Sequence, residues 1–315
     1  MPLLVPRVQQ QPPAAPPPVE EPRPAGSQVV WYSPCGTEIS LSDTIAPGAF
    51  LTNEGVAGLG AAPREVVRQE LAAGGSFARW GQVTERIITL PVFIYADTRE
   101  EFLAWRREFT RHFTDTVPPA SVPKPGRLRV LRSDGSWREI RAIYLDGLTW
   151  EDESSQGSTY DIAVIQLVAP DPYWYGEITP VLEFQAAPAR NYLSPYETVS
   201  PDRSLGQQVV EIAGDNPVLP VWEFVGPATS VQVEIVGGPK LLYGNISAGE
   251  TVTIDTSSYT VVNQLGQNRI GRIDWSVSEL FQIPNGTVTL NLTLNGGVAG
   301  QSAIRLSYRA RWETA

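Results

Sequence analysis

Hydrophobic and polar residues alternate one by one along much of the last hundred residues. In residues 230–236 ("SVQVEIV") valine or isoleucine fills every second position, and residues 287–295 ("TVTLNLTLN") and 303–312 ("AIRLSYRARW") repeat the pattern. Successive side chains of a strand point to opposite faces, so each segment has one apolar and one polar face. With glycine-rich turns between them, these segments predict an antiparallel β-sandwich without a long helix after residue 180.

The first half of the chain also contains strand-like segments. Residues 29–33 ("VVWYS") and 86–96 ("RIITLPVFIYA") are rich in β-branched and aromatic residues. Proline has no backbone N–H, so Pro91 places the second segment at a sheet edge or a bulge.

A single amphipathic helix is predicted next, in "ADTREEFLAWRREFTRHF". Thr98 is a good N-cap, and Glu101 three residues later completes a capping box. One face of the helix is aromatic, with residues spaced by three or four positions: Phe102, Trp105, Phe109 and Phe113. His112, the only histidine, is interpreted as a packed helix residue and not as a ligand.

A hairpin and a further strand follow the helix. Residues 127–145 form two strand-like runs around Asp134-Gly135, a strong turn pair. Residues 158–170 ("STYDIAVIQLVAP") are apolar at consecutive positions, which predicts a central strand buried on both faces.

The segment "APDPYWYG" (169–176) ends this strand with three adjacent aromatic residues. Where the chain is extended, Trp174 should point opposite to Tyr173 and Tyr175. Asp171 and Pro172 favour a turn just before them. We therefore interpret residues 171–175 as a clamp that closes the first domain and as a hinge or interface leading into the second.

Three regions result from these patterns. Residues 1–27 hold the proline-rich "QQQPPAAPPPVEEPRPAG", which favours a disordered, extended tail. Residues 28–180 form an N-terminal domain of strands with one helix, and residues 181–315 form the C-terminal sandwich. The fold class is mainly β.

Composition removes several classes of function. The net charge of −10 does not favour direct binding to nucleic acid, which needs a basic surface. One cysteine and one histidine exclude an intrachain disulfide and the common zinc sites. No membrane insertion is expected, because no run of about 18 apolar residues occurs, and the N-terminus lacks the pattern of a signal peptide.

No constellation of residues predicts catalysis. The segment "DTSSY" (255–259) sets Asp255 beside serines, but such residues at a strand end usually form turns. No "GxSxG" elbow and no phosphate-binding loop occurs. We therefore predict no catalytic residues, no metal and no cofactor, and a structural or binding role.

Several segments, in this order, resemble the distal tail proteins of siphophages. They are "RIITLPVFIYADTREEFLAWRREFTRHF", "GRLRVLRSDGSWREIRAIYLDGLTWE", "IQLVAPDPYWYG", "NPVLPVWEFVGPAT", "ISAGETVTIDTSSYTV" and "IRLSYRARW". The resemblance covers roughly residues 28–315 and leaves the proline-rich start unexplained.

The resemblance implies a fold and an assembly. Residues 28–180 would be a belt domain, a small β-barrel with a helix and a hairpin, and residues 181–315 a galectin-like sandwich. The chain would form a hexameric ring at the distal end of a virion tail, assembled in the bacterial cytoplasm. The ring would contact the tail tube protein, the tail hub or tip protein and a receptor-binding protein, and DNA would pass through its channel without specific binding.

The arginine and aromatic content agrees with a protein built for contacts. The chain has nine tryptophans, and its only lysines are Lys124 and Lys240. Interface cores are enriched in aromatic residues and arginine and depleted in lysine.

Three alternatives stay open at this point. A carbohydrate-binding accessory module would stack sugars on exposed aromatic residues such as Tyr243 or Trp275, although aromatic residues more often lie in cores. A tail-associated glycosidase would need paired carboxylates, which the sequence does not present. A ring of the same kind would also suit a prophage or another phage-derived device.

Overall fold

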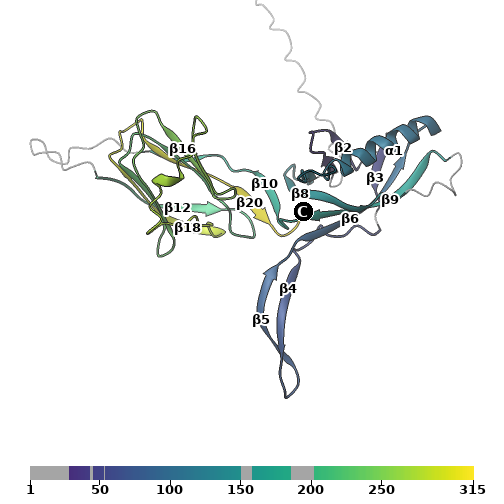
Figure 1. Ribbon diagram of the computed structural model, residues 1–315, viewed down its shortest axis with the longest axis horizontal. Helices are drawn as coiled ribbons and strands as arrows, with labels where there is room; N and C mark the ends of the chain where they lie inside the picture. Colours follow the sequence, from purple (N-terminus) through teal and green to yellow (C-terminus); the bar gives the residue numbers. More distant parts are fainter. Residues whose placement is uncertain (1–27, 43–44, 53, 150–157, 186–201) are drawn as a thin grey trace, which may run out of the picture.

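The computed structural model describes residues 28–42, 45–52, 54–149, 158–185 and 202–315. The predicted tail, residues 1–27, lies outside them. Figure 1 shows two β domains side by side, with a two-stranded arm projecting from the first. Two hydrophobic cores correspond to the two domains, one built from buried residues between 29 and 174 and one from buried residues between 210 and 308. The boundary near residue 180 remains a proposal.

The first domain is a small β-barrel. Its strands follow the order β2-β1-β7-β8-β9-β6-β3, and a bridge between Ser42 and Phe50 brings the two ends of this order together. The strands are β1 (Gln28–Tyr32), β2 (Glu38–Ser40), β3 (Gly48–Leu51), β6 (Arg86–Tyr95), β7 (Gly126–Leu131), β8 (Trp137–Gly147) and β9 (Tyr160–Ala169). The alternate residues that point inward are almost fully buried, as the pattern of a barrel requires.

Helix α1 (Arg99–Thr114) packs its aromatic face into the barrel core. The predicted capping box is present, since Thr98 accepts a hydrogen bond from the Glu101 N–H and the Glu101 side chain accepts one from the Thr98 N–H. Phe113 stacks on Trp31 with 4.8 Å between ring centroids. His112 is buried, as expected of a packed residue. Among the described residues, no helix is long and apolar enough to cross a membrane.

Two predictions about strands need correction. Strand β9 is central, between β8 and β6, but it is buried on one face only. Ile165 and Leu167 point inward, whereas Ile162 and Val164 are 55% and 43% exposed. The outer face of this apolar strand is therefore exposed to solvent in the single chain.

Strand β6 is not an edge strand, because it pairs with β9 on one side and β3 on the other. The Pro91 carbonyl accepts a hydrogen bond from Thr52, just after β3 ends at Leu51. The N–H and C=O of one residue in an antiparallel strand point to the same side. The missing N–H of Pro91 therefore faces a position where β3 has already stopped.

The second domain is the predicted antiparallel sandwich. One sheet has the order β11-β19-β13-β16-β17 and the other β12-β18-β14-β15. The strands are β11 (Leu182–Gln185), β12 (Asp202–Ile212), β13 (Val221–Val225), β14 (Ser230–Ile235), β15 (Lys240–Tyr243), β16 (Thr251–Asp255), β17 (Thr260–Asn263), β18 (Gly286–Asn295) and β19 (Ala303–Ser307). A short 3₁₀ turn, Ile270–Arg272, is the only helical element described after residue 180.

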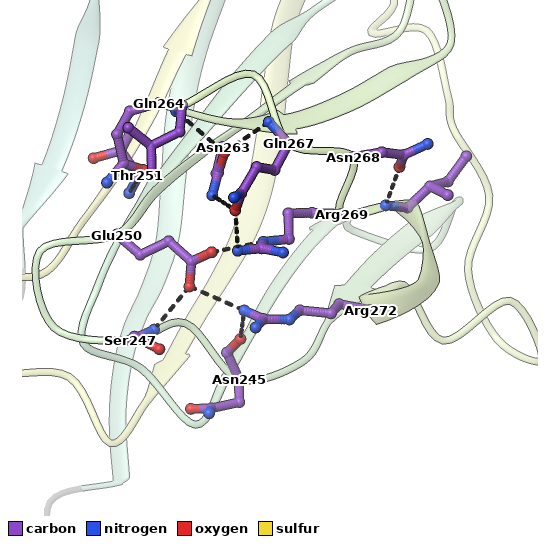
Figure 2. A network of polar contacts seen from close by, with 12 residues as sticks. Asn245, Ser247, Glu250, Thr251, Asn263, Gln264, Gln267, Asn268, Arg269 and Arg272 are labelled. Atoms are coloured by element: carbon purple, nitrogen blue, oxygen red, sulfur yellow. Dashed lines mark hydrogen bonds and ion pairs between the residues drawn. The ribbon is translucent and has the colours of Figure 1, made fainter.

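A buried carboxylate fastens the irregular loop that follows β17 (Figure 2). Glu250 accepts hydrogen bonds from Arg269 Nε at 2.8 Å, Arg272 Nη1 at 3.0 Å and the Ser247 N–H at 3.2 Å. Burial alone would raise the pKa of the Glu250 carboxyl, but these donors outweigh burial and lower the pKa to about 2. The network holds residues 264–272 against the turn before β16.

Two further strands connect the domains. Strand β10 (Trp174–Ile178) leaves the barrel, and β20 (Arg309–Trp312) returns from the sandwich and pairs with it. Figure 1 places the C-terminus in the first domain, beside β6 and β8. The last residues thus pack on the barrel core, although they follow the sandwich in sequence.

The Glu250 network should make stability depend on acid. A carboxyl whose pKa is lowered on folding contributes stability above its unfolded pKa of about 4.3, and this contribution is lost as the pH falls from there toward 2. Glu250→Gln should therefore lower stability at pH 7 and flatten the fall in stability between about pH 5 and 3. Urea unfolding over that pH range measures both effects, and the exposed Glu177→Gln serves as control. Identical pH slopes for wild type and Glu250→Gln would contradict the assignment.

Trp174 should be a large contributor to the barrel core. Its side chain is fully buried, and truncation of such a residue to alanine costs about 3–5 kcal/mol of unfolding free energy. Trp174→Ala is expected to show this loss in urea unfolding. Trp275→Ala, a truncation of the same size at a residue of the sandwich that is 49% exposed, should change stability by less than about 1 kcal/mol. Equal effects of the two variants would refute the role of Trp174.

Candidate assembly surfaces

The segment 171–175 divides its aromatic residues between two sides of the barrel wall. Trp174 points into the core, while Tyr173 and Tyr175 lie on the outer side, as the alternation predicted. There the Arg311 guanidinium lies 4.2 Å from the Tyr173 ring centroid, and Arg309 lies 5.3 Å from that of Tyr175. The aromatic residues therefore hold the returning strand β20.

Asp171 and Pro172 also bind parts of the same junction. The Asp171 carboxylate accepts hydrogen bonds from the Tyr173 N–H and the Tyr175 hydroxyl. Burial, followed by the nearby Asp171 carboxylate, raises the pKa of Tyr175 and keeps its hydroxyl protonated as the donor. These contacts describe a two-strand connection, and its role as a hinge or interface remains a prediction.

A buried guanidinium joins three distant segments at this junction. Arg86 is only 1% exposed, and its donors bind four backbone carbonyls. Nε donates to Pro172 O at 2.7 Å, Nη1 to Gly58 O and Gly60 O at 2.7 and 2.6 Å, and Nη2 to Glu313 O at 2.9 Å. No carboxylate of the described residues bonds directly to Arg86, and desolvation by burial lowers its pKa.

Glu313 fastens the C-terminus to the base of the arm. Its carboxylate accepts hydrogen bonds from Arg64 Nη2 at 2.8 Å, the Ala62 N–H at 2.9 Å and Asn216 Nδ2 at 3.1 Å. Arg64 begins the arm, and Asn216 belongs to the sandwich. One residue near the chain end therefore ties the arm, the barrel and the sandwich together.

The arm consists of β4 (Arg64–Glu70) and β5 (Ser76–Val83), which pair only with each other within the described residues. Every residue of both strands is exposed. Residues directly opposite each other in a hairpin share a face, and Val67 lies opposite Trp80 while Gln69 lies opposite Phe77. One face of the arm thus exposes Val67, Trp80 and Phe77 beside the polar Gln69.

The sequence analysis did not predict the arm. The signal was present in Gly74-Gly75, two glycines with positive φ between "REVVRQE" and "SFARWGQV". Such a pair favours a tight hairpin turn. The strands on either side lack strict alternation of apolar and polar residues, because no core of this chain selects for it.

A second exposed apolar surface lies on the outer face of the barrel, across β6 and β9. Ile162 pairs with Phe93, Tyr160 with Tyr95 and Val168 with Ile87, so these side chains lie in adjacent rows. Ile162, Tyr160 and Ile87 are 55%, 57% and 49% exposed. Phe93 stacks on Tyr160 with ring centroids 5.5 Å apart. Single exposed apolar residues are ordinary, but a contiguous patch marks an interaction site.

The two residues considered for sugar stacking lie in different environments. Tyr243 is fully buried and meets Phe224 edge-on, with centroids 5.9 Å apart, so its proposed role on the surface is wrong. Alternation in β15 turns it toward the sandwich core. Trp275 is 49% exposed and keeps the access that stacking on a sugar requires.

The segment "DTSSY" (255–259) forms a turn. The Asp255 carboxylate accepts hydrogen bonds from the Ser257 N–H and hydroxyl and from the Ser258 hydroxyl. These donors, acting against burial, lower the pKa of Asp255. No group of three or more His, Cys, Asp or Glu residues in the described part of the chain is arranged to hold a metal ion.

Comparison with known proteins links the chain to phage tails. Residues 213–312 match the family model of the siphovirus-type tail component, C-terminal domain. No curated protein sequence matches the chain. The SPP1 Dit (gp 19.1) protein, described as a paradigm of the hub adsorption apparatus in phages that infect Gram-positive bacteria, is similar in fold. Its TM-score is 0.62 at 13% identity, over 90% of this chain and 98% of that chain.

Chains of the phage P2 baseplate are also similar in fold. The baseplate structure with Ca gives a TM-score of 0.51 at 9% identity, over 89% of this chain and 97% of that one. The structure with Sr gives 0.50 at 10% identity over the same shares. The resemblance to siphophage distal tail proteins is therefore confirmed, in sequence for the sandwich and in fold for the chain.

The Arg86 site should be essential for the attachment of the chain end. Arg86→Met keeps much of the side-chain volume but leaves buried carbonyls without donors, which should cost at least about 3 kcal/mol. Urea unfolding measures this loss, and hydrogen exchange should report faster exchange in β20. The exposed Arg79→Met in the arm is the matched control. Unchanged exchange in β20 of Arg86→Met would contradict this role.

Proposed function

We propose that the chain is a structural component of the distal end of a siphophage-type tail, where copies of it close into a ring. The family match and the shared fold support the tail component. The ring rests on one observation: the barrel domain carries two different exposed apolar surfaces, the arm face and the β6–β9 face.

The arm needs a partner in the assembled state. A two-stranded hairpin is at best marginally stable alone in water, and Val67, Phe77 and Trp80 of its apolar face are 43%, 45% and 56% exposed. Figure 1 shows the arm projecting away from the barrel, so it does not cover the β6–β9 face of its own chain. A second copy of the chain supplies that face.

Contact between two different surfaces repeats from copy to copy. Such a head-to-tail interface produces a ring when the rotation between copies closes, and a filament when it does not. The number six comes from the resemblance to distal tail proteins. This role requires no catalytic residues, since a ring component acts by contact.

The remaining partners follow from the same resemblance. The ring would join the tail tube protein to the hub or tip protein and would anchor a receptor-binding protein through the outer sandwich. The SPP1 Dit protein is described as a paradigm of a hub adsorption apparatus, and the phage P2 chains belong to a baseplate. DNA would cross the ring without specific contacts, which suits a chain of net charge −10.

Charges placed in the arm or on the β6–β9 face should prevent ring closure. Purified wild-type chain is expected to show the mass of a hexamer by native mass spectrometry and light scattering. Trp80→Asp and Ile162→Asp replace exposed apolar side chains, so each should stay folded but remain monomeric. Val298→Asp, at an apolar position of the sandwich that is 42% exposed, is the control and should still form the ring.

Mixing the two defective chains separates this arrangement from others. The Trp80→Asp chain keeps an intact β6–β9 face, and the Ile162→Asp chain keeps an intact arm. Their mixture should yield one-to-one heterodimers and no rings. A wild-type chain that stays monomeric up to its solubility limit, or a mixture with no heterodimer, would contradict the proposed contact.

A further inference from the structure

The outer wall of the barrel on the side that faces the sandwich carries a row of closely spaced arginine and aromatic side chains. Register places them on one face, because alternate residues of β1, β7, β8, β10 and β20 point outward together. The members of the row are Tyr32, Arg127, Arg129, Trp137, Arg141, Tyr173, Tyr175, Arg309 and Arg311. This arginine–aromatic row is unlike the rest of an acidic chain.

Contacts between the rings and the guanidinium groups hold the row in place. Arg129 lies 4.9 Å from the Tyr32 ring centroid and 4.1 Å from that of Trp137. The Arg309 guanidinium lies 5.7 Å from the same Trp137 ring centroid. Side chains fixed in this way lose little conformational freedom when a partner binds, which favours recognition.

The positive charge of the row is only partly neutralised by the chain itself. The buried Glu139 carboxylate is shared by Arg129 at 3.0 Å, Arg309 at 3.4 Å and Arg127 at 3.7 Å. The Arg141 side chain is exposed and makes no hydrogen bond or ion pair with any described residue. The face therefore has guanidinium groups left to bind an anion.

A cleft of about 470 Å³ separates this face from the sandwich. Arg141, Tyr175 and Arg309 line the barrel side, whereas Leu219 and Val221 line the sandwich side. Ile178 at the junction is 69% exposed. The walls thus offer guanidinium groups on one side, and on the other an aliphatic surface beside Asp255 and Ser257.

The two other carboxylates that line the cleft are already engaged. Asp171 accepts from Tyr175 and lies 3.8 Å from Arg311, and Asp255 accepts from its own serines. Asp255 keeps its negative charge on the sandwich side, and Arg141 is the guanidinium on the barrel side that no described carboxylate pairs. Arginine binds carboxylates through a planar fork of donors, and aliphatic side chains fill the opposite wall.

We propose that this cleft is a docking groove for an extended, acidic and aliphatic segment of a partner protein. Its carboxylates would bind Arg141 and the outer edge of the row, and its aliphatic side chains would lie against Ile178, Leu219 and Val221. The volume suits a few residues of peptide and not a folded domain or a nucleic-acid duplex. The groove uses none of the residues assigned to ring closure, so the groove and the ring can be tested independently.

Fluorescence polarisation with labelled hexapeptides tests the groove on the full chain. A Glu-Leu repeat should bind, while the corresponding Lys-Leu repeat should not, and binding should weaken as salt is raised. Arg141→Glu and Ile178→Asp alter opposite parts of the groove at exposed positions, so both chains should keep the wild-type melting temperature. Each should weaken binding of the acidic peptide at least tenfold.

Arg107→Glu, an exposed arginine of α1 outside the groove, is the charge-matched control and should bind like wild type. Equal binding of both peptides, no binding of the Glu-Leu peptide, or equal losses in Arg141→Glu and Arg107→Glu would overturn the proposal. Tighter binding of a single-stranded oligonucleotide than of the acidic peptide would also overturn it and assign the surface to phosphates.

Discussion

The structure depends on how the chain end is bound at a single buried guanidinium. Arg86 sits in the first half of the sequence and binds carbonyls of the loop at 58–60, of Pro172 and of Glu313. Burying a charge without these acceptors would be costly, so the four carbonyls and Arg86 require one another. Because Glu313 also holds Arg64 and Asn216, the position of the arm and the contact between domains follow from this one arrangement.

The two domains are consequently coupled more closely than a simple linker would allow. One strand leaves the barrel and another returns from the sandwich, and the two pair along the junction. Trp174 anchors the outgoing strand in the core, while Tyr173 and Tyr175 hold the arginines of the returning one. A connection of two paired strands fixes the orientation of the domains, which suits the proposed place of the chain between a tail tube and an adhesion apparatus.

The surfaces proposed for assembly are apolar or cationic areas that the single chain leaves exposed. Sequence reasoning interpreted the apolar residues of β9 as buried on both faces, and in the single chain Ile162 and Val164 are exposed. The error has a physical cause. An apolar residue that another molecule would cover cannot be distinguished, by residue type, from one that its own fold covers. The arm was missed because strands that pack on another molecule need not alternate in the pattern that a core imposes.

The sequence by itself determined the elements whose signal is local. The capping box at Thr98 and Glu101, the turn at Asp134-Gly135, the alternation in β14 and β18 and the opposite orientation of Trp174 depend only on neighbouring residues. Only the tertiary structure decided that Arg86 meets Glu313, that Tyr243 is buried and that the arginines of β7, β8 and β20 form one face. These contacts join residues far apart in sequence, and the order of strands in a sheet, which no local pattern contains, brings them together.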